Sequence, residues 1–393
     1  MYDMECTCEQ KKHTVPVKCI EVSENAVEKV PELLKGYQRI FMVADENTYE
    51  VAGRRVEELL KNAGMLSHVC VLKNPALPTD KNIGTVLIEA GRDADVYDIN
   101  AYSLNPDYIL GVGSGSINDT CRMVSYRLGI DYGIVGTAPS MDGYASVVAP
   151  LLMGSTKKVY TCSIARHIII DLNLCAEAPY ELLLAGVGDM IGKYVAILDW
   201  ELSNHLTGEY YCEKIAGMVL DATKKCVDTA TVLKERKIDT MKNTVDGLIL
   251  SGLGMAYTGS SRPASGTEHM VGQTWEIMDL EKGHVPNLHG IEVGEATFVA
   301  MAMYKRLYQE TNEEWLKQLI ARYIPAFDAI FELQKEIKLP FTVTDKDKYV
   351  EGILRGRTFR VRYTLLQYLY DRGMLEDYAE WSYDEVMKYN LAD

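Results

Sequence analysis

The sequence DYILGVGSGSIND, Asp107–Asp119, joins an apolar run to a helical pattern through three closely spaced glycines. Gly111, Gly113 and Gly115 allow the backbone to approach a ligand, and the helix that follows offers unpaired N–H groups and the positive end of its dipole. Such a turn suits a diphosphate. Its spacing is GxGxG, which fits neither the GxGxxG fingerprint nor a P-loop, and a purely structural turn is the alternative.

Between about residues 15 and 172, short apolar runs typical of strands alternate with longer amphipathic runs typical of helices. The predicted strands are 15–22, 39–45, 67–73, 107–113, 131–137 and 166–172, and the predicted helices are 48–64, 82–92 and 116–129. This alternation predicts a largely parallel sheet covered by helices on both faces. Residues 146–162 interrupt it, because their pattern predicts a β-hairpin.

The pattern changes at Pro179, after which long helical runs dominate and β-branched alternation nearly disappears. The predicted helices of this part include 179–186, 189–204, 209–227, 295–310, 313–323 and 384–393. We therefore predict two domains, an α/β domain over residues 1–178 and an all-helical domain over residues 179–393. A ligand cleft between two such domains is the default expectation.

The composition is that of an ordinary globular protein: 393 residues, 47% hydrophobic and 25% charged, with a formal net charge of −15. Acidic and basic residues are interspersed, and the lack of a basic stripe argues against nucleic acid or an anionic membrane as partner. No apolar run approaches the roughly 18 residues of a membrane span. The N-terminal residues lack the apolar segment of a secretory signal, so we expect a cytoplasmic protein.

The nine cysteines are scattered through the chain, as expected of reduced thiols rather than of a disulfide framework. Cys6 and Cys8, with His13 nearby, supply half of a metal site. No second Cys/His pair at zinc-finger spacing follows them, so a surface N-terminal segment is the favoured interpretation.

Three side chains in glycine-flanked contexts form a candidate metal site: Asp189 in AGVGDMIGKY, His269 in SGTEHMVGQ and His289 in NLHGIEVG. Two imidazoles and one carboxylate leave coordination positions open, as a catalytic ion requires. Gly186 and Gly188 are expected to end one helix, so that Asp189 begins the next. Spacing alone leaves the alternatives open, since an aspartate at a helix start is usually a cap and a single histidine is usually packed.

Two further acidic positions follow predicted strands. Asp45 ends the strand at residues 39–45, where a carboxylate can accept hydrogen bonds from a ribose diol. It precedes the glycine turn by 66 positions, whereas the acid of a standard Rossmann unit follows the turn by about twenty, and a helix cap is the alternative. The segment GTAPSMDGYASVVAP, Gly136–Pro150, holds one charge, Asp142, in an Asp-Gly turn dipeptide.

Five motifs in this order, GVGSGSIND, TAPSMDGYAS, AGVGDMIGKY, SGTEH and LHG, closely resemble those of the sn-glycerol-1-phosphate dehydrogenases. This family belongs to a superfamily of metal-dependent alcohol and glycerol dehydrogenases and dehydroquinate synthases. The resemblance spans about Arg39 to Gly294 and does not include residues before Val15 or after about Pro340. It implies a dehydroquinate synthase-like fold, an α/β dinucleotide-binding domain followed by an all-α metal-binding domain.

The resemblance also implies a role for each matching position. Asp45 would hold the adenosine ribose, and Asp142 would contact substrate. The diphosphate would lie on Gly111, Gly113, Ser114 and Gly115, the nicotinamide on Thr137, Ala138, Ser140 and Ser146, and one divalent ion, commonly zinc and in some relatives nickel or iron, on Asp189, His269 and His289. Members of the family reduce dihydroxyacetone phosphate with NADH or NADPH while the ion stabilises the developing alkoxide.

One position departs from the family pattern. Members that make glycerol 1-phosphate generally carry a second histidine four residues after His269, where this chain has Gln273. On a helix the two side chains share a face, so Gln273 is expected to point toward the substrate. Glutamine cannot shuttle a proton near neutral pH. The nearby His284 is expected to be solvent-exposed and to be no replacement.

Several lysines and arginines are weaker candidates. Lys193, four residues after Asp189, is either a ligand for a substrate phosphate or a plain helix lysine. Arg262, Lys157 and Lys158 are further phosphate candidates for which a surface position is favoured. Few Lys or Arg residues cluster near Asp189 in the sequence, which disfavours a dehydroquinate synthase-like lyase.

The leading hypothesis is a metal-dependent NAD(P)H oxidoreductase that reduces a small phosphorylated ketone, first dihydroxyacetone phosphate to sn-glycerol 1-phosphate. Asp45 favours NADH over NADPH, because a carboxylate near the ribose repels a 2′-phosphate. The candidate catalytic side chains are Asp142, Asp189, Lys193 and Gln273. The alternatives are a dehydrogenase of another polyol or sugar phosphate, a lyase, and a nucleotide-binding regulator with a degraded site. We expect a homo-oligomer, with a dimer as the first expectation.

Overall fold

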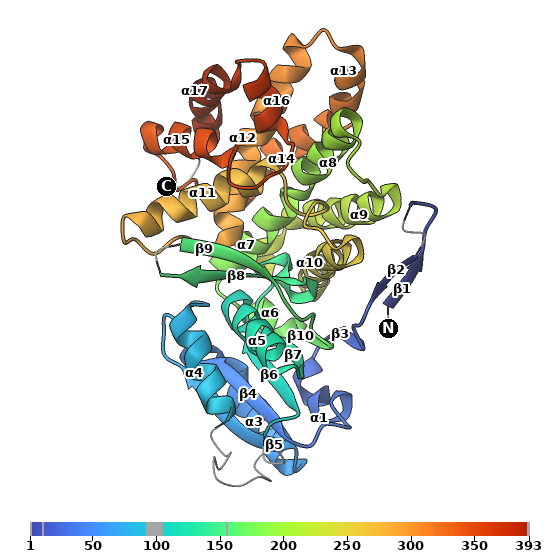
Figure 1. Cartoon of the computed structure of the whole chain (residues 1–393), viewed down its shortest axis with the longest axis vertical. Helices are drawn as coiled ribbons and strands as arrows, with labels where there is room; N and C mark the ends of the chain where they lie inside the picture. The colour runs from blue at the N-terminus through green and yellow to red at the C-terminus, as the bar shows by residue number, and fades with distance from the viewer. Residues whose placement is uncertain (1, 10–11, 92–104, 155, 391–393) are drawn as a thin grey trace.

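The computed structural model describes residues 2–9, 12–91, 105–154 and 156–390, and it divides into a strand-rich half and a helical half (Figure 1). The central sheet of the first half consists of β3 (Cys19–Ser23), β4 (Ile40–Asp45), β5 (Leu66–Leu72), β6 (Tyr108–Gly113), β7 (Asp131–Gly136) and β10 (His167–Asp171). These six strands are all parallel and lie in the order β3-β10-β7-β6-β4-β5. The predicted parallel sheet is confirmed.

Helices cover both faces of this sheet. The helical segments of this half are η1 (Ala26–Lys29), α1 (Val30–Leu33), α2 (Glu46–Thr48), η2 (Tyr49–Gly53), α3 (Arg54–Asn62), α4 (Asp80–Ala90), α5 (Gly115–Leu128), η4 (Asp142–Ala145) and α6 (Leu172–Glu177). Alternate residues of β4 enter opposite cores, as the pleat of a strand requires. Met42 packs in one core with Val56 of α3, and Val43 packs in the other with Val86 of α4 and Ile117 of α5.

The glycine turn lies at the carboxyl edge of the sheet, between β6 and α5. Gly113 ends β6 and pairs in register with Gly136, which ends the neighbouring β7. A Cβ on Gly113 would lie 2.7 Å from Cγ1 of Ile117, so the glycine lets α5 pack against the end of its own strand. The predicted end of this helix at Gly129 is confirmed by a left-handed C-cap with φ 68°.

The second half is helical, and the predicted fold class is confirmed. Its helical segments are α7 (Tyr180–Ile191), α8 (Lys193–Thr207), α9 (Glu213–Ala230), η5 (Leu233–Glu235), α10 (Ile238–Thr258), α11 (Thr267–Glu281), α12 (His289–Glu310), α13 (Glu314–Ala321), α14 (Ile324–Ile337), α15 (Lys346–Gly356), α16 (Leu365–Asp371), α17 (Leu375–Val386) and η6 (Met387–Tyr389). Residues 391–393 of the last predicted helix lie outside the described residues. The domain boundary at residue 178 stays a prediction. Within the described ranges, no helix combines the length and hydropathy of a membrane span.

The predicted helix break before Asp189 is wrong. α7 runs through Gly186 and Gly188 without interruption, so Asp189 lies near its C-terminal end, and the break comes at Gly192. The two glycines instead permit close backbone contacts. A Cβ on Gly186 would lie 1.8 Å from the carbonyl oxygen of Pro139, and one on Gly188 would lie 2.1 Å from that of Gly290.

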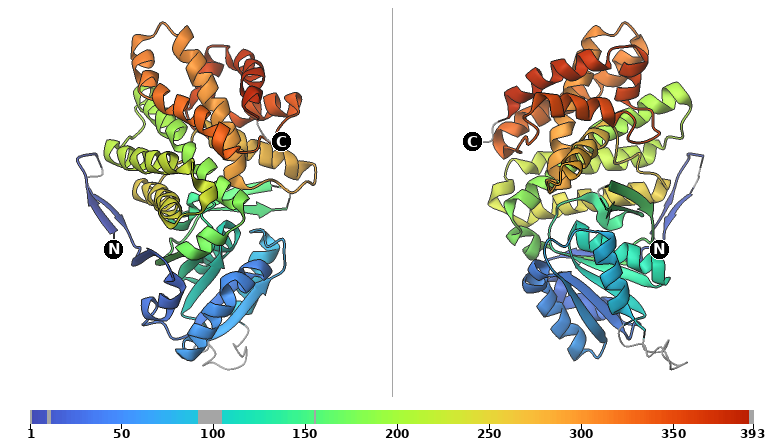
Figure 2. Two further views of the ribbon diagram at one scale, coloured as in Figure 1. Left: turned by 180° about the vertical axis from the view of Figure 1, so that it is seen from behind. Right: turned by 60° about the vertical axis from the view of Figure 1, so that its left-hand side comes forward.

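Two antiparallel hairpins lie outside the central sheet. The predicted hairpin is confirmed as β8 (Val148–Met153) with β9 (Thr156–Thr161). It contacts α4 and α5 on one side and α11 on the other, so it bridges the two halves. The second hairpin, β1 (Tyr2–Glu5) with β2 (Lys12–Val15), packs through β2 against α10. Figure 2 shows it at the side of the molecule in both views.

Candidate active site

A cavity of about 410 Å³ lies between the strand-rich half and the helical half. Its wall combines side chains that the sequence separates by more than a hundred positions. They include Ser114 and Gly115 from the glycine turn, Ser140, Asp142 and Ser146 from the segment after β7, and His269, Gln273 and His289 from the helical half. The structure thus brings the glycine turn, the Asp142 segment and both histidines to one space.

The cofactor side of this cavity is built where β6 and β7 end side by side. Ser114 Oγ and Ser140 Oγ lie 2.8 Å apart and join the two loops. The Thr137 N–H donates to the Gly113 carbonyl, 3.1 Å away, behind this contact. Among the described residues that line the cavity, Gly111, Gly113, Thr137 and Ala138 do not appear. These four therefore shape the wall from behind rather than form its surface.

Asp45 ends β4, which pairs with β6, and so lies at the same edge of the sheet. Its Oδ1 accepts hydrogen bonds from the amides of Asn47 and Thr48, both at 2.9 Å. The Asp45 amide donates in return to the hydroxyl of Thr48, which completes a capping box. The helix-cap interpretation of Asp45 is therefore correct, and its contact with a ribose stays a prediction.

The three candidate metal ligands converge from three helices. Asp189 lies near the end of α7, His269 near the start of α11, and His289 at the start of α12. One ligand atom from each lies within 4.8 Å of the others. The two imidazole rings have their centroids 5.2 Å apart, and Asp189 is fully buried. The donor set of one carboxylate and two imidazoles can hold a divalent ion with positions left open.

A carboxyl group behind His269 orients its ring. His269 Nδ1 lies 2.8 Å from Glu268 Oε1, which leaves Nε2 facing Asp189 Oδ1 at 3.7 Å. Burial lowers the pKa of His269, and the nearby Lys193 lowers it further, so the ring is neutral and suited to ligate. Burial raises the pKa of Glu268 to about 8. The motif SGTEH contains Glu268, but its role as a ring-orienting carboxylate was not predicted.

Lys193 lies between two buried carboxylates and outside the cavity wall. Its Nζ lies 2.5 Å from Asp189 Oδ1 and 2.7 Å from Asp142 Oδ2, and it donates to the Ala264 carbonyl at 3.1 Å. Burial lowers the pKa of Lys193, but Asp142 and Asp189 raise it by more. Asp142 also accepts from Ser251 at 2.8 Å, while its amide donates to Asp189 Oδ2 at 2.9 Å. The three protons of the Lys193 ammonium are thus already directed at protein acceptors.

Gln273 lines the cavity one turn of α11 after His269, and a second polar group meets it there. Arg360 Nη2 donates to Gln273 Oε1 at 3.0 Å, and Arg360 Nη1 donates to Ser261 Oγ at 2.9 Å. Arg362 donates to the same hydroxyl at 2.8 Å. Burial lowers the pKa of Arg360, and burial together with Arg360 lowers the pKa of Arg362 to about 9. Two guanidinium groups therefore share the half-buried Ser261 hydroxyl at the cavity wall.

Arg360 was not predicted as a site residue, because it follows the part of the chain that the family motifs cover. The run RGRTFRVR at residues 355–362 has four arginines within eight positions. That local cluster is the signal that sequence reasoning could have used. The expectation of few basic side chains near Asp189 is correspondingly incomplete.

The surface position favoured for Lys157 is wrong. Lys157, on β9, lines the cavity and is ion-paired with Glu276 of α11. Burial raises the pKa of Glu276, but Lys157 and His289 lower it to about 2 overall. Lys158 and His284 are exposed, as predicted.

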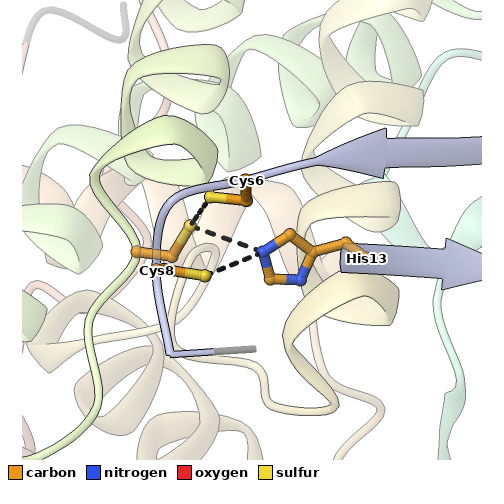
Figure 3. A group of neighbouring side chains, drawn as sticks. Cys6, Cys8 and His13 are labelled. Carbon is orange, nitrogen blue, oxygen red and sulfur yellow. Dashed lines mark hydrogen bonds between the residues drawn. The ribbon is translucent and has the colours of Figure 1, made fainter. Parts of the chain in front are cut away.

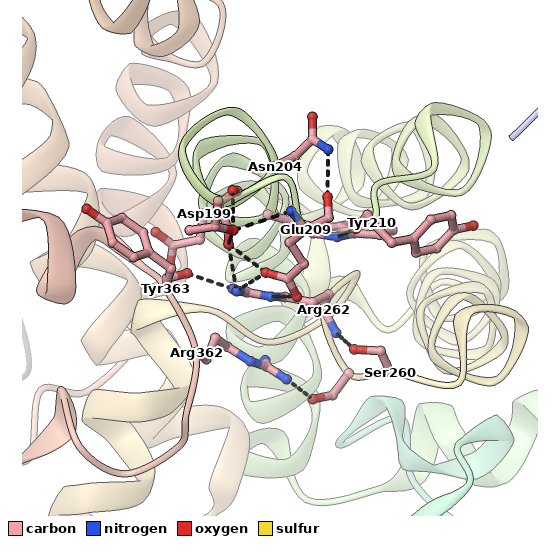
Figure 4. Close-up of polar contacts among 12 residues, drawn as sticks. Asp199, Asn204, Glu209, Tyr210, Ser260, Arg262, Arg362 and Tyr363 are labelled. Atoms are coloured by element: carbon pink, nitrogen blue, oxygen red, sulfur yellow. Dashed lines mark hydrogen bonds and ion pairs between the residues drawn. The ribbon is translucent and has the colours of Figure 1, made fainter. Parts of the chain in front are cut away.

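The surface position favoured for Arg262 is wrong too. It is only 2% exposed and is ion-paired with Glu209, and it donates to the Tyr363 carbonyl at 2.9 Å (Figure 4). Its guanidinium is thus directed at protein acceptors in the helical half, which leaves it unsuited to a substrate phosphate.

Asp199 of α8 fixes the start of the helix that carries His269. Its carboxylate accepts from the Thr267 amide at 2.6 Å, from the Leu365 amide at 2.8 Å and from the Tyr304 hydroxyl at 2.5 Å. Figure 4 shows Asp199 among the polar contacts that surround Arg262. The same carboxylate therefore ties the C-terminal segment to the first turn of α11.

The chain is similar to a known protein family and to several characterised relatives. The family model described as iron-containing alcohol dehydrogenase matches residues 21–179. The glycerol-1-phosphate dehydrogenase [NAD(P)+] of Halalkalibacterium halodurans is 33% identical over 77% of this chain and 74% of its own length. The protein of the same name from Bacillus licheniformis is 29% identical over 94% of this chain and 93% of its own length.

Solved structures show the same fold at low sequence identity. The glycerol dehydrogenase of Schizosaccharomyces pombe superimposes with a TM-score of 0.68 at 15% identity, over 95% of this chain and 90% of that one. An iron-containing alcohol dehydrogenase of Thermotoga maritima gives a TM-score of 0.67 at 15% identity, over 96% and 99%. These structures show the fold, and the 33% identical relative of Halalkalibacterium halodurans, together with the family model, shows that the chain belongs to the glycerol-1-phosphate dehydrogenase family, NAD(P)-dependent enzymes of the iron-containing alcohol dehydrogenase type.

Proposed function

We propose that the protein uses NAD(P)H and one divalent metal ion to reduce a small phosphorylated ketone, with dihydroxyacetone phosphate as substrate and sn-glycerol 1-phosphate as product. The observation that supports this proposal best is the shared cavity. It is lined by the serines at the ends of β6 and β7, by the two histidines and by the Arg360 guanidinium. A cofactor, a metal ion and a phosphate therefore have complementary groups around one substrate-sized space.

The proposed metal ligands are Asp189, His269 and His289. Their donor chemistry fits zinc, iron or nickel, and two imidazoles with one carboxylate leave room for a substrate oxygen. A divalent ion held by these residues would supply Lewis-acid polarisation of the substrate carbonyl. Glu268 holds the His269 ring in the orientation that directs Nε2 toward Asp189.

Lys193 and Asp142 act in this proposal as positioning residues. The Lys193 ammonium compensates the charge of the buried Asp189 carboxylate. The Asp142 amide donates to the second Asp189 oxygen and fixes its rotation. Because Lys193 also holds the Asp142 carboxylate, the substrate-facing segment and the metal ligand share one cation.

The dinucleotide binds, in this proposal, at the carboxyl edge of the sheet. Ser114 and Gly115 at the N-terminus of α5 would hold its diphosphate, and Ser140 and Ser146 would line the nicotinamide side. Asp45 meets the adenosine ribose. Its cap bonds both use Oδ1, which leaves Oδ2 for a ribose hydroxyl and favours NADH over a 2′-phosphorylated cofactor.

Arg360 is the proposed contact for the substrate phosphate. Burial depresses its pKa, so a dianionic phosphate stabilises its charged form. The Gln273 amide, which accepts from Arg360, orients the guanidinium from α11. Gln273 carries no titratable proton near neutral pH, so the proton of the product hydroxyl comes from another group or from water.

The test is NADH oxidation by metal-loaded protein with dihydroxyacetone phosphate, with unphosphorylated dihydroxyacetone and a panel of tetrose and pentose phosphates alongside. We expect phosphate-dependent NADH oxidation that is lost in His269→Ala. A product that sn-glycerol-3-phosphate dehydrogenase does not oxidise identifies the 1-phosphate enantiomer. Absence of NADH oxidation with every sugar phosphate, or phosphate release without net NADH change, would contradict the proposal. The cytoplasmic location and the homo-oligomer stay predictions.

A further inference from the structure

A second group of metal-binding side chains lies away from the cavity, where the N-terminal hairpin meets the helical half. It consists of Cys6, Cys8, His13 and Cys212, and one ligand atom of each lies within 4.8 Å of the others. Cys6 and Cys8 follow β1, His13 lies in β2, and Cys212 immediately precedes α9. Figure 3 shows Cys6, Cys8 and His13 turned toward one another. We call these four residues the Cys3His group.

The spacing of the ligand atoms matches a tetrahedral zinc site. In such a site, with Zn–S bonds of about 2.3 Å and a Zn–N bond of about 2.0 Å, neighbouring ligand atoms lie about 3.5–3.8 Å apart. Cys6 Sγ lies 3.5 Å from Cys212 Sγ. His13 Nε2 lies 3.2 Å from Cys8 Sγ and 3.6 Å from Cys212 Sγ. These three distances are close to the tetrahedral values, and all four ligand atoms lie within 4.8 Å of one another.

The surroundings of the group orient it for a metal. His13 Nδ1 lies 3.0 Å from the Tyr257 carbonyl, which fixes the proton on Nδ1 and leaves the lone pair of Nε2 facing the sulfurs. The Tyr210 hydroxyl lies 3.3 Å from Cys8 Sγ. Cys212 is the N-cap of α9, which fixes its position at the start of that helix. His13 is 1% exposed and Cys212 is fully buried.

We propose that the Cys3His group binds one structural zinc ion. Three thiolates and one imidazole are soft ligands of the kind that zinc prefers, and four protein ligands close the coordination sphere, so no position remains for a substrate. Binding displaces the three thiol protons. The proposal is independent of the proposed function, because it shares no residue with the site around Asp189.

A disulfide does not account for the group. An S–S bond is about 2.0 Å long, whereas Cys6 Sγ and Cys212 Sγ lie 3.5 Å apart. Such a bond would also leave Cys8 and His13 without a reason to direct their ligand atoms to the same point.

Zinc in this group would join the N-terminal hairpin to the helical half. A two-stranded hairpin is at best marginally stable alone in water, and this one meets α10 through β2. The ion links β1 and β2 to the start of α9, and through the His13–Tyr257 contact to the end of α10. The sequence supplied only three of the four ligands locally, since Cys212 follows His13 by 199 positions.

Cobalt substitution of the full-length protein tests the proposal. A thiolate bound to Co²⁺ gives an intense charge-transfer band in the near ultraviolet, and the site around Asp189 has no sulfur ligand. We expect this band, at one Co²⁺ per chain, in the wild type and in His269→Ala. It should be lost in Cys212→Ser and kept in the control Cys162→Ser, which removes a half-buried cysteine outside the group. Absence of the band from the wild type, or its persistence in Cys212→Ser, overturns the proposal.

A measurement on the zinc-loaded wild type avoids the risk that Cys212→Ser fails to fold. The protein is titrated with a mercurial thiol reagent while a zinc indicator reports free zinc. We expect thiol modification to release one zinc ion per chain from the wild type. His269→Ala should also release one zinc ion per chain in this step. No zinc release on thiol modification overturns the proposal. A Cys6–Cys212 disulfide found by peptide mapping of the metal-loaded protein overturns it too.

Discussion

Lys193 Nζ lies 2.5 Å from Asp189 Oδ1, and neither side chain is exposed to solvent. The same ammonium lies 2.7 Å from Asp142 Oδ2, so one buried cation compensates two buried carboxylates. Its removal would leave both buried carboxylates without a compensating positive charge.

We therefore expect Lys193→Met to lower the free energy of unfolding of the metal-free protein by about 3–5 kcal/mol, the usual effect of removing one partner of a buried ion pair. The loss should be smaller with Zn²⁺ bound, because the ion compensates Asp189. Urea unfolding with and without Zn²⁺ measures both values. The double variant Lys193→Met/Asp142→Asn, which removes one unpaired charge, should recover part of the loss. An equal loss with and without metal contradicts this interpretation.

Replacement of Arg360 tests the phosphate contact. Arg360→Ala should raise the KM for the phosphorylated ketone by about 10–100-fold, the equivalent of one charge-assisted contact of about 1.5–3 kcal/mol, with a smaller change in kcat. Arg357→Ala is the matched control, since Arg357 donates to Gln367 and stacks on Tyr370 instead. Steady-state kinetics measure both constants. If both variants raise the KM equally, Arg360 is not the specific contact for the phosphate.

Gln273→His tests whether the departure from the family pattern limits the reaction. An imidazole one turn after His269 can protonate a developing alkoxide near neutral pH, and we expect about a 10-fold gain in kcat with dihydroxyacetone phosphate. Gln273→Asn is the control without a titratable ring. Equal rates in the wild type and Gln273→His, over the substrate panel and a pH series, would show that the proton follows another route.

Asp45→Asn separates the two roles of this side chain. Asparagine caps a helix about as well as aspartate, so α2 should keep its start, while the charge that repels a 2′-phosphate is lost. The ratio of NADPH to NADH affinity should rise about 10-fold, roughly 1.4 kcal/mol. Cofactor fluorescence titrations measure both dissociation constants. An unchanged ratio would mean that Asp45 serves only as the cap of α2.

Gly186→Ala tests the close contact between α7 and the segment after β7. Its Cβ would lie 1.8 Å from the Pro139 carbonyl oxygen, a backbone atom, so the helix has to move. We expect a loss of more than about 3 kcal/mol in the free energy of unfolding. Gly217→Ala in α9 meets no atom within 4 Å and should instead stabilise the protein slightly. Similar melting temperatures for both variants would argue against a rigid contact.

The features predicted correctly are those that local sequence determines. The alternation of apolar and amphipathic runs indicated the order of the strands along the chain. The glycine turn at Gly113 was predicted because a helix begins directly after the strand there. Hairpin β8–β9 was recognised for the same reason. The glycines of α7 were misjudged, because the contact that requires Gly186 comes from Pro139, 47 positions away in the chain.

The side chains that escaped prediction depend on contacts between distant segments. Arg360 reaches Gln273 across 87 positions, and Lys157 reaches Glu276 across 119. Neither pair has a characteristic spacing, since the loops between them can take any length. The family motifs therefore identified the proposed metal ligands, while Arg360 and the position of Lys157 at the cavity became visible only in the fold.

The Lys157–Glu276 ion pair has a mechanical consequence. Lys157 extends from a hairpin that rests on α4 and α5, and Glu276 belongs to the helix that bears His269. Any hinge motion that separates the two halves must pull this pair apart. Glu276 Oε1 also lies 3.6 Å from His289 Nδ1, so such a motion changes the field at that ring. The pair therefore joins the two halves at the cavity wall, next to one of the histidines proposed as metal ligands.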